Sequence, residues 1–91
     1  MSMTHDIAAM EQWLYQHGCT RFAISDRETV HCDWMYGDSA LCNKTNQSGK
    51  DVEVSLREVK AEATVYAYMK LKHRLKNYAG ISGEETCLNN T

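Results

Sequence analysis

The feature that most constrains the fold is one uninterrupted helical pattern over residues 56–79, which corresponds to about six turns. Apolar and small side chains recur there at steps of three or four, as on the buried side of a helix: Leu56, Val59, Ala63, Ala67, Leu71, Leu75 and Tyr78. Ser55 and Glu58 have the spacing of a capping box, and Gly80 is placed to end the helix. The chain contains no proline that could break it.

A second apolar group on the same helix is not explained by that pattern: Val65, Tyr66, Tyr68 and Met69. Because no side of the stretch 64–69 is strongly polar, something broader than one sheet face must cover it. Two alternatives remain open. Other strands, the first helix or the C-terminal tail cover these residues, or they form a surface patch that binds another protein or a second copy in a homodimer.

The remaining elements are short. Thr4 is placed to cap a helix over residues 5–17, which Gly18 ends. Residues 20–25, with Phe22 and Ile24 on one face, and residues 29–36 alternate as two strands of a hairpin. Residues 39–45 predict a third strand, and residues 43–50 are polar enough for a loop.

The predicted fold class is therefore α+β: an N-terminal helix, an antiparallel β-hairpin with a third strand, and a long C-terminal helix. Both helices should pack on one face of the sheet. In the second strand Val30, Cys32, Trp34 and Tyr36 share one face, which predicts that they point into the core. Residues 1–81 should form a single compact domain, with a loose tail at 82–91.

Five potential metal ligands occur within 26 residues: His17, Cys19, His31, Cys32 and Cys42. Zinc sites usually take ligands in pairs across a tight turn, and no such pair is present. His31 and Cys32 are neighbours on a predicted strand, so they should point to opposite faces. We therefore expect no metal and no cofactor, and we expect the cysteines to be buried free thiols.

No motif predicts an enzyme. The cysteines lack a neighbouring base held in a defined geometry, and no two carboxylates are forced together by their spacing. The five glycines are scattered singly, so no phosphate-binding loop is indicated.

The charge pattern leaves a nucleic-acid role as the alternative function. A formal net charge of −2 with mixed signs is not typical of a dedicated nucleic-acid binder. The end of the long helix is nevertheless basic, and a regulator could contact phosphates there through Lys70, Lys72, Arg74 and Lys76. The same residues also complement the helix dipole.

The first choice is a non-enzymatic protein-interaction module that masks another protein's surface through Val65, Tyr66, Tyr68 and Met69. Tyrosine and methionine are enriched at the centres of interfaces. By analogy of size and style, such a module resembles phage and mobile-element products that inhibit host systems. The first 15 residues lack the apolar region of a secretory signal and no apolar stretch approaches 18 residues, so we expect a cytoplasmic protein without a membrane partner.

Overall fold

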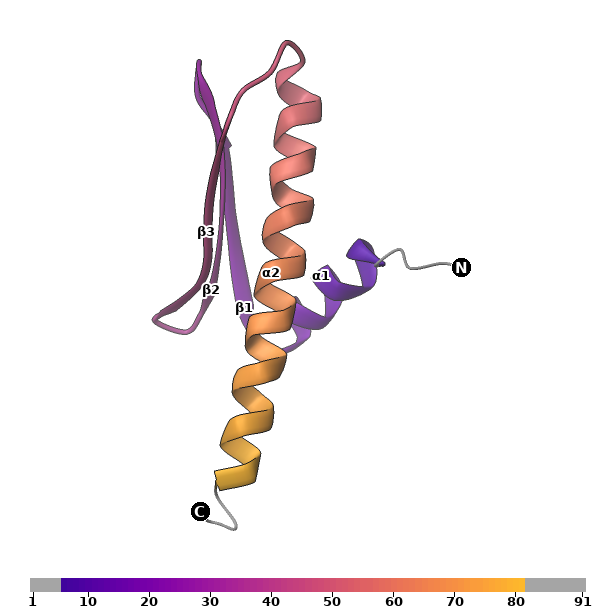
Figure 1. The fold of residues 1–91 in the computed structure, drawn as a ribbon, viewed down its shortest axis with the longest axis vertical. Coiled ribbons are helices and arrows are strands. Elements are labelled where there is room, and N and C mark those ends of the chain that lie inside the picture. Colours follow the sequence, from indigo (N-terminus) through magenta and orange to yellow (C-terminus); the bar gives the residue numbers. More distant parts are fainter. Residues whose placement is uncertain (1–5, 82–91) are drawn as a thin grey trace.

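The computed structural model describes residues 6–81 and contains two helices and three strands. In chain order they are α1 (Ile7–Gln16), β1 (Cys19–Ser25), β2 (Thr29–Tyr36), β3 (Ser39–Gln47) and α2 (Val52–Ile81). The strands form one antiparallel sheet in the order β1-β2-β3. Both helices lie on the same side of this sheet, and α2 packs across β2 and β3 (Figure 1). The predicted α+β architecture, including its third strand, is confirmed.

Helix α1 is capped by Asp6, whose carboxylate accepts a hydrogen bond from the Ala9 backbone N–H at 3.1 Å. Thr4, the cap expected from the sequence, lies outside the described residues. At the other end Gly18 has a φ of 86°, a left-handed conformation that glycine adopts without strain. The chain can therefore turn sharply from α1 into β1.

The inner face of the sheet carries the residues predicted for the core of β2, since Val30, Cys32 and Trp34 are fully buried. The large apolar residues of β1 lie on the other face. Phe22 pairs with Asp33 and is 57% exposed, and Ile24 pairs with His31 and is 51% exposed.

The inner face of β1 accommodates an arginine in place of these apolar side chains. Arg21 pairs with Trp34 across the strands, and its guanidinium carbon lies 5.7 Å from the Trp34 ring centre. Arg21 also forms an ion pair with Glu11 of α1. This contact between the consecutive elements α1 and β1 lets a cation lie at the edge of the core.

Strand β3 is longer than predicted and continues through residues 43–47, which we expected to begin a loop. Its register shifts between Trp34, which pairs with Cys42, and Met35, which pairs with Ala40. Leu41 is therefore the extra residue of a β-bulge. The bulge allows the consecutive residues Leu41 and Cys42 both to be buried.

Helix α2 begins at Val52, four residues before the predicted start, so the predicted capping box is wrong. The cap is Asp51, whose Oδ1 accepts a hydrogen bond from the Val54 backbone N–H at 3.2 Å. The Ser55 hydroxyl instead donates to the Asp51 carbonyl at 3.0 Å and accepts from the Gly49 N–H at 2.8 Å. Ser55 therefore fastens the preceding loop to the first turn of the helix.

The buried side of α2 is the predicted one, because Val59, Ala63, Ala67 and Leu71 are all inaccessible to solvent. Leu56 and Leu75 pack at the margin of the core, and the Tyr78 side chain lies outside the described residues. The largest core side chain is Trp34, and its Nε1 donates a hydrogen bond to the buried Thr64 Oγ1 at 3.3 Å. Within residues 6–81, neither helix has the length and apolar character needed to cross a membrane.

Candidate functional site

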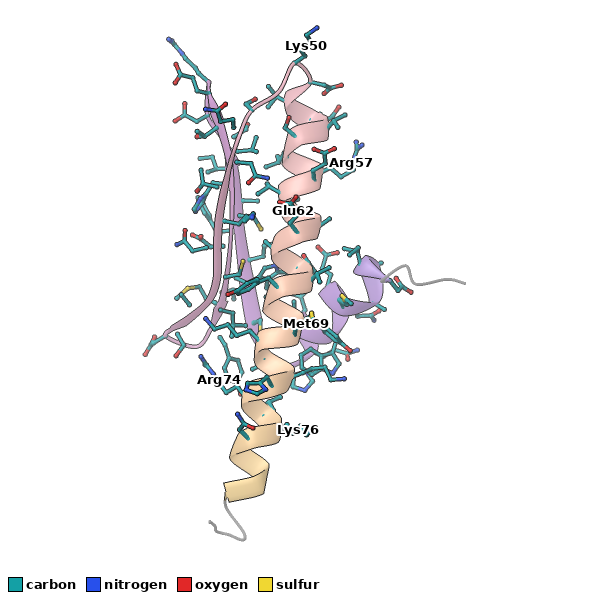
Figure 2. All side chains as sticks on the ribbon, viewed as in Figure 1. Lys50, Arg57, Glu62, Met69, Arg74 and Lys76 are labelled. Atoms are coloured by element: carbon teal, nitrogen blue, oxygen red, sulfur yellow. The ribbon has the colours of Figure 1, made fainter. Side chains whose placement is uncertain are left out.

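The middle of α2 presents two large apolar side chains to solvent. Tyr66 is 60% exposed and Met69 is 58% exposed. Steps of three and four residues place Lys70 and His73 beside them on one side of the helix. We call Tyr66, Met69, Lys70 and His73 the exposed face of α2. Glu62 and Met69, two turns apart, follow one another along the helix (Figure 2).

The exposed face arises from the way the buried residues wind around α2. They follow one another by four residues from Val59 to Leu71, and each such step rotates the buried direction by about 40°. Over three steps the buried side turns by about 120°, away from Tyr66 and toward α1. The rotation leaves Tyr66 and Met69 without a covering element among the described residues.

The other two predicted interface residues, Val65 and Tyr68, are half-buried. The Tyr68 ring meets the Trp13 ring of α1 edge to face, with centroids 5.1 Å apart. Lys72 covers the same tyrosine, with its Nζ 5.2 Å from the ring centre. Tyr68 therefore belongs to the contact between α1 and α2, and it does not lie on the same side of α2 as Tyr66 and Met69.

A groove runs along the boundary between β3 and the exposed face of α2. It consists of two hollows of about 340 and 360 Å³ that share Tyr66 and Lys70. Residues 40–44 of β3 line the first hollow, and Met69 and His73 line the second. We call this feature the β3–α2 groove. It is flanked by an edge strand, because β3 pairs only with β2 within the described part of the chain.

The β3–α2 groove is positively charged. Its lining contains Lys44, Lys70 and His73, and no carboxylate of the described residues belongs to it. Glu62 lies at one end, where its carboxylate accepts from Asn46 Nδ2 at 3.0 Å and lies 3.9 Å from Lys44 Nζ. Among the described residues, no carboxylate lies within ion-pair distance of Lys70.

The basic residues at the end of α2 do not share one side of the helix. Lys70 and Arg74 are one turn apart on the side of the groove, whereas Lys72 and Lys76 lie nearly opposite. Figure 2 shows Arg74 and Lys76 on opposite sides of α2. This end of the helix extends beyond the sheet (Figure 1). The four cations therefore do not form a continuous track for a phosphate backbone.

The candidate metal ligands are not brought together. Cys32 points into the core, whereas His31 lies on the outer sheet face, with its Nδ1 2.6 Å from Thr45 Oγ1 and its Nε2 2.8 Å from Asp33 Oδ1. In residues 6–81 no three His, Cys, Asp or Glu side chains cluster as metal ligands would. Burial raises the pKa of all three described thiols: Cys19, Cys32 and Cys42. A raised pKa lowers thiolate content and hence nucleophilicity.

Sequence reasoning missed the contribution of β3 to this surface. Lys44 and Lys70 are far apart along the chain, and only the tertiary packing places both on one groove. His73 gave no separate signal, because it lies within a basic stretch. Comparisons with protein-family models, curated proteins and solved structures find no match for this chain.

Proposed function

We propose that this chain is a small non-enzymatic module that binds another protein through the exposed face of α2 and thereby masks that protein's surface. The observation that carries the proposal is the exposure of Tyr66 and Met69, each by more than half, on a helix whose buried residues anchor it in the core. A rigid helix loses little conformational freedom on binding, which favours affinity.

The energy available at this face is sufficient for an interface centre. An aromatic side chain presents roughly 200 Å², so a tyrosine that is 60% exposed, as Tyr66 is, leaves about 120 Å² to cover. At about 25 cal/mol per Å², full coverage contributes about 3 kcal/mol before the costs of association. Met69 adds a flexible apolar neighbour that adapts to the shape of a partner.

The role that we propose for such a module is inhibition by occupancy. A bound module prevents other molecules from reaching the covered surface and needs no chemistry of its own. The similarity in size to phage and mobile-element inhibitors of host systems motivates this part of the proposal. A second copy of the chain is the other occupant that this face would fit.

Site-specific photo-crosslinking in the cells that produce the chain tests the proposal. A photoreactive phenylalanine analogue replaces Tyr66 or Met69, and a matched control places it at Phe22, an equally exposed position on the outer sheet face. We expect one discrete protein adduct from positions 66 and 69 that excess wild-type chain suppresses. Adducts from position 22 alone, or no specific adduct at all, would contradict the proposal.

The nucleic-acid alternative has weaker support, because its four basic residues divide between two sides of α2. A variant with all four residues replaced by alanine tests this alternative in electrophoretic mobility shifts at low and high salt. The four residues are Lys70, Lys72, Arg74 and Lys76. Salt-sensitive binding below micromolar concentration that this variant loses would establish the alternative.

A further inference from the structure

We infer that the β3–α2 groove binds an extended acidic segment of the partner protein, which adds to β3 as a fourth strand at the edge that no described strand occupies. The inference rests on the proposed function and specifies the chemistry of the partner. It follows from three features that meet at the groove: a strand edge that pairs with no other strand within residues 6–81, an exposed apolar pair and a local excess of cations.

The strand edge determines the conformation of the bound segment. An added strand would lie about 4.8 Å from β3, beside residues 40–44 that line the first hollow. Its backbone would satisfy the outward N–H and C=O groups of β3, as in other cases of strand addition. Every second side chain would then point toward the side of the sheet on which α2 lies, over Tyr66 and Lys70.

The lining determines the sequence of the segment. Lys44 and Lys70 attract carboxylates, and His73 adds a third donor at the far end. Tyr66 and Met69 require an apolar side chain between those carboxylates. The chain as a whole carries a formal charge of −2, so the positive groove is a local departure from its overall sign. Such complementarity favours specificity and a high association rate.

The same features disfavour a second copy as the occupant of the edge. Two β3 edges paired with each other would bring the lysines of both grooves together, and like charges facing each other destabilise a sheet. A lysine near an edge is a device by which sheet proteins avoid pairing with themselves. Lys44 fits that role, and its charge still accepts an acidic strand.

A library of random dodecapeptides displayed on phage, selected against the immobilised full-length chain, tests the inference. The expected consensus has two acidic residues around an apolar one, at the alternating spacing of a strand. Selected peptides should lose at least tenfold in affinity for Lys44→Glu/Lys70→Glu and keep it for the matched control Lys72→Glu/Lys76→Glu. Hydrogen exchange should slow at residues 40–44 when the peptide binds.

Several outcomes overturn the inference. Peptides without acidic residues, peptides with apolar residues at helical spacing, or binding that ignores the Lys44→Glu/Lys70→Glu change would each do so. So would the absence of any enriched peptide, or dimerisation through β3 detected by light scattering. If non-acidic peptides bind and Tyr66→Ala abolishes their binding, the inference fails while the proposed function stands. If binding ignores Tyr66→Ala as well, both fail.

Discussion

Replacing Thr64 by valine should destabilise the fold through a single buried hydrogen bond. Trp34 is fully buried against the inner sheet face, and its Nε1 donates to Thr64 Oγ1 at 3.3 Å. Valine has nearly the same shape as threonine but offers no acceptor. The Thr64→Val change therefore isolates the loss of the acceptor from a change in packing.

The magnitude follows from the burial of both partners. A buried donor left without an acceptor costs about 1–3 kcal/mol, and removing the buried hydroxyl recovers a part of that. We expect a net loss of about 1–2 kcal/mol, a large share of a small domain's stability. In a domain of this size each kcal/mol lowers Tm by about 4–8 °C.

Urea unfolding followed by circular dichroism at 222 nm measures the effect. A double-mutant cycle with Trp34→Phe separates the hydrogen bond from the packing loss at Trp34, and we expect a coupling of about 1 kcal/mol. An unchanged m value would show that the denatured state is unaffected. If Thr64→Val is as stable as the wild type and the coupling is near zero, the hydrogen bond does not stabilise the fold.

Three further predictions concern local features. Tyr68→Ala should lower the free energy of unfolding by about 2 kcal/mol because it removes the ring that packs on Trp13. Tyr66→Ala should lower it by less than about 1 kcal/mol, because Tyr66 is mostly exposed. Equal losses of Tm in the two variants would refute this difference. Asp51→Ala should cost about 1 kcal/mol by removing the cap of α2, and an unchanged urea midpoint would locate the cap elsewhere. Because burial raises the pKa of the core thiols above the ordinary value of a thiol, they should react with iodoacetamide more slowly in the folded chain than in urea, as peptide mapping would show. Equal alkylation rates in the folded and unfolded chain would refute this account. As the pH rises, the unfolded chain loses its thiol protons before the folded chain does, so the free energy of unfolding should fall above about pH 9. These thiols are Cys19, Cys32 and Cys42.

The periodic parts of the fold were predictable because burial imposes a period on the sequence. The buried side of α2 and the alternation of β2 around Trp34 each follow from one local pattern. The start of α2 was not predictable in this way. Asp51 and Ser55 are both good caps, and the contact between Ser55 and the Gly49 N–H selects Asp51.

The candidate site was predictable only in part. The sequence pattern indicated that α2 carries more apolar surface than one sheet face covers, but not which residues remain exposed. That depends on α1, which covers Tyr68 through Trp13 and leaves Tyr66 open. The contribution of Lys44 depends on strand pairing and helix packing together, which no local pattern reports.

The central claim is that Tyr66 and Met69 form the energetic centre of a protein interface. Once photo-crosslinking identifies the partner, isothermal titration calorimetry of that protein with the wild type and with Tyr66→Ala/Met69→Ala tests the claim directly. We predict a loss of affinity of at least about 30-fold, which corresponds to about 2 kcal/mol, with the variant still folded. A folded variant that binds the partner as tightly as the wild type would contradict the claim.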